Sequence, residues 1–308
     1  MSTAFILLSL VAGSLLALQA GANAQLSKAV DSPMAATTLQ LGVGALLLLG
    51  VTVLTGTFSA LPLLSGAPWW HIIGGVASAF YVVSTILLFP RIGAVVSVGL
   101  FIAGQLLASA ALDVFGLLGV AASGLTPGIA IGAVLVMIGA GLIVLGQWGA
   151  RAGIGRTELG WIGLALLAGA VLPVQGAVNA LLRHDLGGAA FAVGLVSFAV
   201  AMLTMAAVQL GVSALTGHPK PRLDGLPSMP WWGWLGGFAG ATYVTTVFTA
   251  IPTIGAAATV GLTVAGQQMA SVLVDRYGWL RLPQRPVSAT RLIGVAILLL
   301  GVAIVRLM

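Results

Sequence analysis

One long segment of the sequence occurs twice, and this repetition constrains the fold more than any other feature. Residues 69–113 align without a gap with residues 231–275 at a constant offset of 162, and 21 of the 45 aligned positions are identical. The identical pairs include Tyr81 and Tyr243, Pro90 and Pro252, Gly104 and Gly266, Gln105 and Gln267, and Asp113 and Asp275. Chance does not produce such an alignment, so the chain is predicted to contain two copies of one structural unit.

The composition places both copies in a lipid bilayer. Of the 308 residues, 59% are hydrophobic and only 6% are charged, which leaves too little polar surface to cover a soluble globule of this size. Glycine-rich apolar runs of about 20 residues are typical of membrane-spanning helices, because a helix satisfies its backbone hydrogen bonds internally. We therefore predict an all-α membrane protein with ten transmembrane helices and the lipid bilayer as its surroundings.

The expected helices follow the repeat, with five in each copy. They cover residues 4–24, 36–59, 69–88, 93–112, 127–147, 159–182, 187–215, 231–250, 255–274 and 290–307. The first unit is then 1–148, the connecting loop 149–158 and the second unit 159–308. Pro90 is expected to end the third helix, because proline lacks the backbone N–H and its ring clashes with the preceding turn.

The first helix ends in an Ala-Asn-Ala sequence at residues 22–24, which resembles a signal-peptidase site. Two of its polar residues, Gln19 and Asn23, recur at an offset of 156 inside the chain, as Gln175 and Asn179. That internal helix cannot be a signal, and no positive charge precedes the first apolar run. We therefore expect the first helix to be retained.

The orientation of the two copies follows from the odd number of helices in each. A five-helix unit returns the chain to the opposite face, so the second copy is predicted to be inverted relative to the first. Connections after odd-numbered helices hold Lys28, Arg91, Arg151, Arg156, Lys220, Arg222, Arg276, Arg281, Arg285 and Arg291, whereas Arg183 and Arg306 lie on the other side. By the positive-inside rule both termini are predicted to be non-cytoplasmic. Inverted repeats that share a midplane site are common in secondary transporters.

Several classes of chemistry are excluded by residues that the sequence lacks. The absence of cysteine excludes a thiol nucleophile and a Cys-ligated zinc site, and the three histidines are dispersed among loops. No phosphate-binding glycine loop occurs, and the basic residues are scattered rather than gathered on one nucleic-acid-binding face. We expect no metal, no cofactor, no nucleic-acid partner and no enzymatic activity.

Four carboxamides lie within the apolar helices, where polar groups usually have a function. Gln19 lies four residues before Asn23, and Gln175 four residues before Asn179, so each pair occupies one helix face. Facing each other across a pseudo-twofold axis, they would form an uncharged clamp for a substrate. The alternative is that they hydrogen-bond neighbouring helices, at about 1 kcal/mol each.

Two tyrosines and two further glutamines also recur at equivalent positions. Tyr81 and Tyr243 lie in the middle of their helices, away from the interfacial belts that tyrosine favours. Each is expected either to line a cavity or to pack with an internal hydrogen bond. Gln105 and Gln267 leave the same alternatives open, and the glycine spacing around them favours close helix packing over ligand binding.

Asp113 and Asp275 are the only repeated acids. Each is expected at a helix end near water, on opposite faces of the membrane, so they cannot act as a catalytic carboxylate pair. We expect either a gate or helix-end contact, with Arg276 beside Asp275, or solvated helix ends. Arg91, which follows Pro90, could touch an anionic ligand at a cytoplasmic entrance.

Three repeated signatures resemble the YdcZ-like branch of the drug/metabolite transporter superfamily. They are the Gln-x-x-x-Asn pattern of the first helix in each half, the segments GGVASAFY and GGFAGATY, and the helices that begin IGA and continue through Gly-Gln and Ala-Ser to aspartate. The resemblance implies a ten-helix transporter of the bacterial inner membrane, in the fused form of units that otherwise pair antiparallel. Related small multidrug transporters carry a glutamate in the first helix. Gln19 and Gln175 replace it here, which argues against proton-coupled cation export.

These observations leave three hypotheses for the function. The favoured hypothesis is a secondary transporter that moves a small neutral or weakly polar metabolite or drug by alternating access, as a monomer or a homodimer. The alternatives are a membrane assembly or structural subunit, and a membrane enzyme, for which no acid, base or metal cluster can be assembled. If Gln19, Gln175 and the two repeated tyrosines converge on one cavity, transport is favoured.

Overall fold

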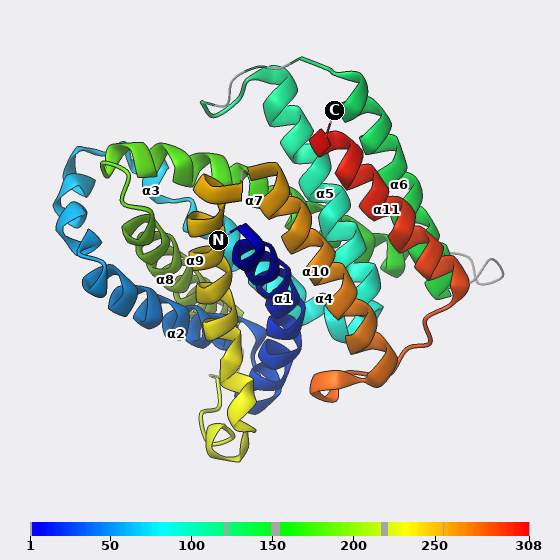
Figure 1. Cartoon of the computed structure of the whole chain (residues 1–308). Helices are drawn as coiled ribbons and strands as arrows, with labels where there is room; N and C mark the ends of the chain where they lie inside the picture. The colour runs from blue at the N-terminus through cyan, green and yellow to red at the C-terminus, as the bar shows by residue number, and fades with distance from the viewer. Residues whose placement is uncertain are drawn as a thin grey trace.

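The protein is entirely helical in the part of the chain that the structure describes. The computed structural model describes residues 2–119, 122, 124–148, 155–216, 221–254 and 256–307. Arg151, Lys220 and most of the expected connecting loop fall outside these residues. Eleven α-helices and four short 3-10 helices were found within them, without a β-strand (Figure 1). The predicted all-α class is therefore confirmed.

Each of the ten predicted segments contains at least one helix. The α-helices are α1 (Ser2–Val30), α2 (Pro33–Leu54), α3 (Trp69–Ile72), α4 (Gly75–Ile92), α5 (Ala94–Phe115), α6 (Pro127–Trp148), α7 (Arg156–Asp185), α8 (Ala190–Thr216), α9 (Leu235–Ile254), α10 (Ala256–Tyr277) and α11 (Ala289–Leu307). The 3-10 helices are η1 (Thr57–Gly66), η2 (Leu226–Ser228), η3 (Trp231–Trp234) and η4 (Trp279–Arg281).

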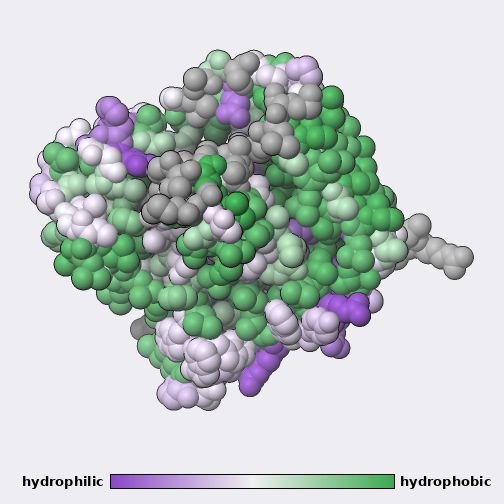
Figure 2. All heavy atoms as spheres, in the orientation of Figure 1, coloured by the Kyte–Doolittle hydropathy of each residue, from purple (hydrophilic) through white to green (hydrophobic). Residues whose placement is uncertain are grey.

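The outer surface suits a lipid environment. Among the described residues, seven helical segments are long and apolar enough to cross a membrane, namely Thr3–Val30, Pro33–Leu54, Trp69–Ile92, Ala94–Phe115, Pro127–Gln147, Arg156–Asp185 and Ala190–Thr216. Large hydrophobic side chains on the outside of the bundle are exposed, with Leu46 and Leu210 both 70% accessible. Figure 2 shows hydrophobic residues over much of the visible face. In water such a surface would aggregate, whereas in a bilayer it contacts acyl chains.

The helices of the two copies are interleaved. Helix α1 packs on α9 and α10, and its counterpart α7 packs on α4 and α5, while α2 packs on α8. Glycines permit these close contacts at equivalent positions: a β-carbon on Gly104 would overlap the backbone of Leu166, and one on Gly266 would overlap that of Leu10. The glycine spacing around Gln105 and Gln267 therefore serves close helix packing, as the sequence predicts.

Helices α6 and α11 form a separate close pair at one edge of the bundle (Figure 1). Glycines seven residues apart on each helix face each other. A β-carbon on Gly132 would lie 2.7 Å from the carbonyl oxygen of Gly301, and one on Gly139 would lie 2.7 Å from that of Gly294. Because only glycine leaves room for the facing backbone, these positions fix the separation of the two helices.

Several helix boundaries differ from the prediction, and α1, expected to end at residue 24, continues to Val30. Helix α4 continues through Pro90 to Ile92 and ends at Gly93, which has φ of 84°. A proline in the last turn removes one donor without ending the helix, whereas the positive φ of Gly93 does end it. The expected helix 69–88 is divided into α3 and α4, and the end of the expected helix 36–59 is the 3-10 helix η1.

Candidate substrate cavity

A cavity of about 330 Å³ lies among the helices of both copies, and we call it the central cavity. Most of its wall consists of leucine, valine, isoleucine and phenylalanine side chains. The polar lining residues are Gln19, Ser78, Tyr81, Gln105, Ser109, Gln175, Asn179 and Tyr243. No charged residue is among the described residues of the wall, so the cavity offers hydrogen bonds without a fixed charge.

The structure brings six of the eight predicted site residues to this one cavity. The two exceptions are Asn23 and Gln267. The Asn23 side chain is fully buried against Gly236, where a β-carbon would overlap its Oδ1 atom. The Gln267 amide donates from Nε2 to the hydroxyl of Tyr81 at 3.1 Å, so it acts on the cavity only through Tyr81.

The carboxamides of α7 are held by serine hydroxyls. Gln175 Nε2 donates to Ser78 Oγ at 2.5 Å and to Ser197 Oγ at 3.2 Å. Asn179 Nδ2 donates to the same Ser197 oxygen at 3.3 Å. Sequence reasoning did not identify these serines. Ser78 follows the repeated Gly-Gly pair by three residues, but its counterpart at an offset of 162 is Gly240, so the repeat could not mark it.

Tyr81 lines the central cavity. Its side chain is buried, and its ring packs edge-to-face on Phe101, with centroids 5.2 Å apart. Its hydroxyl accepts the hydrogen bond from Gln267. Tyr243, at the equivalent position of α9, lines the same cavity. Both expectations for Tyr81, cavity lining and an internal hydrogen bond, are therefore met by one side chain.

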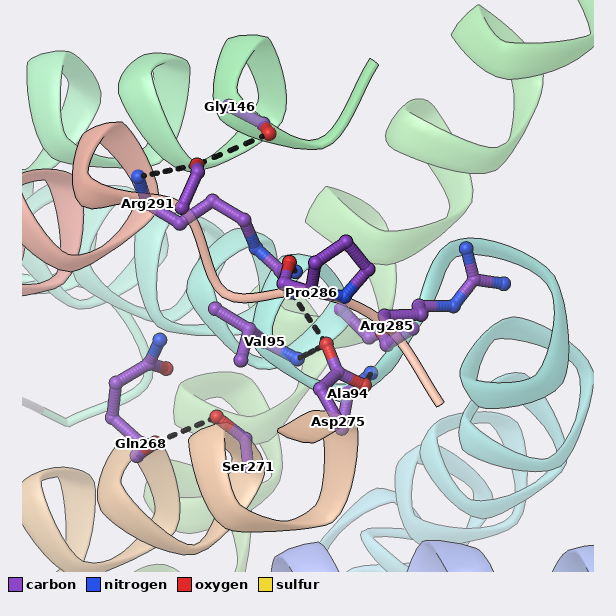
Figure 3. Close-up of polar contacts among 12 residues, drawn as sticks. Ala94, Val95, Gly146, Gln268, Ser271, Asp275, Arg285, Pro286 and Arg291 are labelled. Atoms are coloured by element: carbon purple, nitrogen blue, oxygen red, sulfur yellow. Dashed lines mark hydrogen bonds and ion pairs between the residues drawn. The ribbon is translucent and has the colours of Figure 1, made fainter. Parts of the chain in front are cut away.

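A buried ion pair lies where the end of α10 meets the first turns of α5 and α11 (Figure 3). Arg291 is fully buried, and its Nη2 atom donates to Asp275 Oδ2 at 2.5 Å. The same carboxylate accepts hydrogen bonds from the backbone N–H groups of Ala94 at 2.7 Å and Val95 at 3.1 Å. Asp275 thus caps the N-terminus of α5, since the preceding Gly93 has no side chain to do so.

The loop before α11 adds to this contact. The Arg285 N–H donates to the Asp275 carbonyl at 2.8 Å, and its guanidinium donates to the carbonyls of Pro90 and Arg91. We call Asp275, Arg285, Arg291 and the N-terminus of α5 the Asp275 cluster. Of the two expectations for Asp275, the helix-end contact is met and the solvated helix end is wrong, because Asp275 is 2% exposed. Its charged partner is Arg291, 16 residues further along the chain, and not the expected Arg276.

The central cavity lies away from the Asp275 cluster. Val264 on α10 is 11 residues from Asp275, and Ile102, the nearest lining residue on α5, is eight residues from Ala94, which at 1.5 Å per residue gives about 16 Å and about 12 Å. Arg91 does not reach the cavity, because its guanidinium lies over the Trp161 ring, 4.8 Å from the centroid. Asp113 is half-buried in the last turn of α5.

A second polar contact, which sequence reasoning missed, lies at the opposite end. His71 Nδ1 and Asp185 Oδ2 are 2.5 Å apart, joining α3 to the end of α7. His71 lies just before the N-terminus of α4, and Arg285 contacts the Pro90 carbonyl near the C-terminus of the same helix. Polar side chains therefore join helices at both ends of the bundle. The repeat could not indicate this pair, because the position equivalent to His71 is Gly233.

Interleaved apolar helices around a cavity of small-molecule size define a helical membrane protein of the polytopic class. The sequence matches the family model described as "Putative inner membrane exporter, YdcZ" over residues 4–142 and 160–304, and the chain belongs to this family. It is therefore a transport protein of the inner membrane, and the family resemblance found in the sequence is confirmed.

Comparison with solved structures supports the fold. A crystal structure of another protein, 18% identical in sequence, superposes with a TM-score of 0.59 and covers 96% of this chain and 95% of its own. At this identity the likeness concerns the fold alone. A search of curated proteins gave no significant match.

Proposed function

We propose that the protein exports a small, uncharged, largely apolar molecule by alternating access. The observation that carries this proposal is the convergence of six polar side chains from repeated positions on one cavity whose described lining residues carry no charge. Separate helix–helix contacts, which a purely structural subunit would need, do not require these groups to meet. The direction of transport follows the family description.

The cavity limits the substrate by charge and by size. Transfer of an ion into an apolar wall without a counter-charge is strongly unfavourable, so a neutral molecule is expected. A volume of about 330 Å³ lies at the lower end of the range for small-molecule sites. The carboxamides and hydroxyls would orient the substrate, while the leucine and valine side chains would cover its apolar part.

Alternating access rests on two inverted units of five spans each. The Asp275 cluster lies on the face that carries Arg91, Arg281 and Arg285, which the positive-inside rule makes cytoplasmic. On α4, α7 and α10 the lining residues lie in the half of the helix farther from the Asp275 cluster, so we assign the structure to a state closed toward the cytoplasm. Both termini are then on the non-cytoplasmic side.

The orientation can be tested with single cysteines, because the chain contains no cysteine of its own. We expect cysteines that replace Leu125 and Arg281 to react with membrane-impermeant reagents from opposite sides of the membrane.

Transport by the purified full-length protein in proteoliposomes tests the proposal directly. We expect one or more uncharged compounds from a metabolite panel to cross the membrane faster than in protein-free vesicles. The double variant Gln19→Ala with Gln175→Ala should reduce that rate at least tenfold, whereas Gln284→Ala, on the exposed loop, should leave it unchanged. Transport that persists in the double variant would contradict the site, and no transport of any compound would contradict the function.

A further inference from the structure

We infer that the two repeated glutamines of the cavity have different roles, and that Gln19 binds a substrate carrying a lactam or another cis-amide group. Gln175 is instead a positioning residue. This inference rests on the proposed function and deepens it, because it assigns a chemical class to the substrate. It also predicts that the cavity recognises its ligand from one copy of the repeat.

The donors of Gln175 are already used within the protein. Both of its amide hydrogens have hydroxyl acceptors, Ser78 Oγ at 2.5 Å and Ser197 Oγ at 3.2 Å. Ser78 lies on α4 and Ser197 on α8, so the amide of α7 is fixed between two helices. A substrate could reach its remaining oxygen but would have to displace a serine to use its donors.

Gln19 occupies the equivalent place without such partners. The counterpart of Ser78 is Gly240, and a β-carbon there would lie 3.1 Å from Gln19 Nε2. Gln40 takes the place of Ser197 in space, because a β-carbon on Gly237 would meet the Gln40 carbonyl as one on the equivalent Gly75 would meet that of Ser197. The Gln40 amide itself donates to the Gly236 carbonyl. Gln19 is only 6% exposed, lines the cavity, and has no hydrogen-bond partner in the part of the chain that the structure describes.

An unpaired amide in an apolar wall selects for a complementary ligand. The side chain presents an acceptor and a donor side by side, so it can pair with a group that carries a donor and an acceptor on one edge. Glutamine and asparagine pair in this way with the adenine edge in DNA. A lactam ring holds its N–H and C=O on the same edge, whereas an open-chain trans amide points them apart.

Gln105 is the other carboxamide of the cavity wall whose side chain makes no hydrogen bond among the described residues, and it fits this interpretation as a secondary contact. It is more exposed than Gln19 and can bind water. A site that leaves a buried partner unpaired discriminates strongly against analogues that lack the matching group. Gln19 is therefore the residue that should distinguish a lactam from its isosteres.

Binding of three matched probes to the full-length protein in detergent tests the inference. The probes are 4-phenylpyrrolidin-2-one, its N-methyl derivative and the corresponding lactone, measured by isothermal titration calorimetry. We expect the lactam to bind at least tenfold more tightly than the other two. Gln19→Met, which keeps the side-chain volume, should make the three affinities equal, and Gln175→Met should retain the preference for the lactam.

A second test leaves both glutamines in place and introduces a hydroxyl into the second copy, at the position equivalent to Ser78. Gly240→Ser would offer Gln19 the partner that Ser78 gives Gln175, so the preference for the lactam should fall at least fivefold, while Gly240→Ala, the steric control, should retain it. Equal binding of the three probes by the unmodified protein, or a preference that survives Gln19→Met, would overturn the inference. Transport of other uncharged compounds without dependence on Gln19 would overturn it too, yet leave the proposed function intact.

Discussion

Arg291 shows how a single residue can join three elements inside an apolar bundle. Its side chain is the largest of those that are fully buried among the described residues, and its charge is balanced by Asp275. The position equivalent to Arg291 in the first copy is Ile129. The guanidinium of this ion pair therefore belongs to one copy alone, and it stabilises the end of the bundle that we assign to the cytoplasm.

We expect Arg291→Met to destabilise the protein strongly. The substitution leaves the Asp275 carboxylate buried without its counter-charge, and breaking a buried pair in this way costs about 3–5 kcal/mol. Denaturant unfolding in detergent, followed by tryptophan fluorescence, measures the change. Arg276→Met removes an exposed charge from the neighbouring position and should change the free energy of unfolding by less than about 0.5 kcal/mol. Similar values for the two variants would show that the ion pair is not needed for stability.

Single residues were predicted from the sequence where the repeat marked them. Gln19, Gln175, Tyr81 and Tyr243 could be selected because each is polar, deep in an apolar helix and present in both copies. Arg291 could be counted only as a loop charge, because its burial depends on a loop that folds back over α5. The partners of Gln175 were equally hidden, since hydroxyls on other helices leave no pattern in its own sequence.

At the scale of the elements, the packing of α6 on α11 shows how glycine spacing sets the distance between two helices. Gly139 packs on the backbone of α11, where a β-carbon would lie 2.6 Å from the Leu298 nitrogen. Gly141 is two residues away on the same helix, and a β-carbon there would meet nothing within 4 Å. The two positions therefore separate steric effects from helix propensity.

Gly139→Ala should destabilise the protein by about 1–3 kcal/mol, because the added methyl forces the backbones apart. Gly141→Ala should be neutral or stabilising by up to about 1 kcal/mol, because alanine favours the helix more than glycine does. Unfolding curves of the two variants in the same detergent give the comparison. If Gly139→Ala were as stable as Gly141→Ala, the close crossing would not be present in the protein.

The existence of the helices was more predictable than their ends. Apolar runs of about 20 residues indicated each predicted helix, because a bilayer admits few other backbone structures. The ends depend on local geometry that composition does not reveal. Helix α4 passes Pro90 and stops at Gly93, and the segment 57–66 folds as a 3-10 helix rather than as the end of α2.

At the scale of the whole molecule, the main feature is that the two copies contribute different residues to the central cavity. Ser109 of α5 lines it, whereas Ser271, the equivalent residue of α10, is fully buried near the Asp275 cluster. Gln268 lies beside Ser271 and has no side-chain partner among the described residues (Figure 3). In alternating access each copy would adopt the conformation that the other copy now has. Ser271 and Gln268 would then line the cavity, and Ser109 would be buried.

We therefore expect the labelling rates of cysteines at positions 109 and 271 to change in opposite directions when the conformation changes. In the state described here, Ser109→Cys should react with a small methanethiosulfonate reagent at least tenfold faster than Ser271→Cys. Weakening of the Asp275 cluster by Arg285→Gln should slow the first reaction and speed the second. Mass spectrometry of the labelled protein measures both rates. Parallel changes at the two cysteines would indicate general loosening instead of an exchange between two states.

The difference between Ser78 and Gly240 has a consequence for how such proteins evolve. When two identical subunits assemble, every substitution appears on both sides of the binding pocket. One glutamine then cannot lose its serine partner while the equivalent glutamine keeps it. Fusion of the duplicated gene removes that coupling. One half can then change the residues that contact the substrate, while the other half keeps the contacts that hold the helices together.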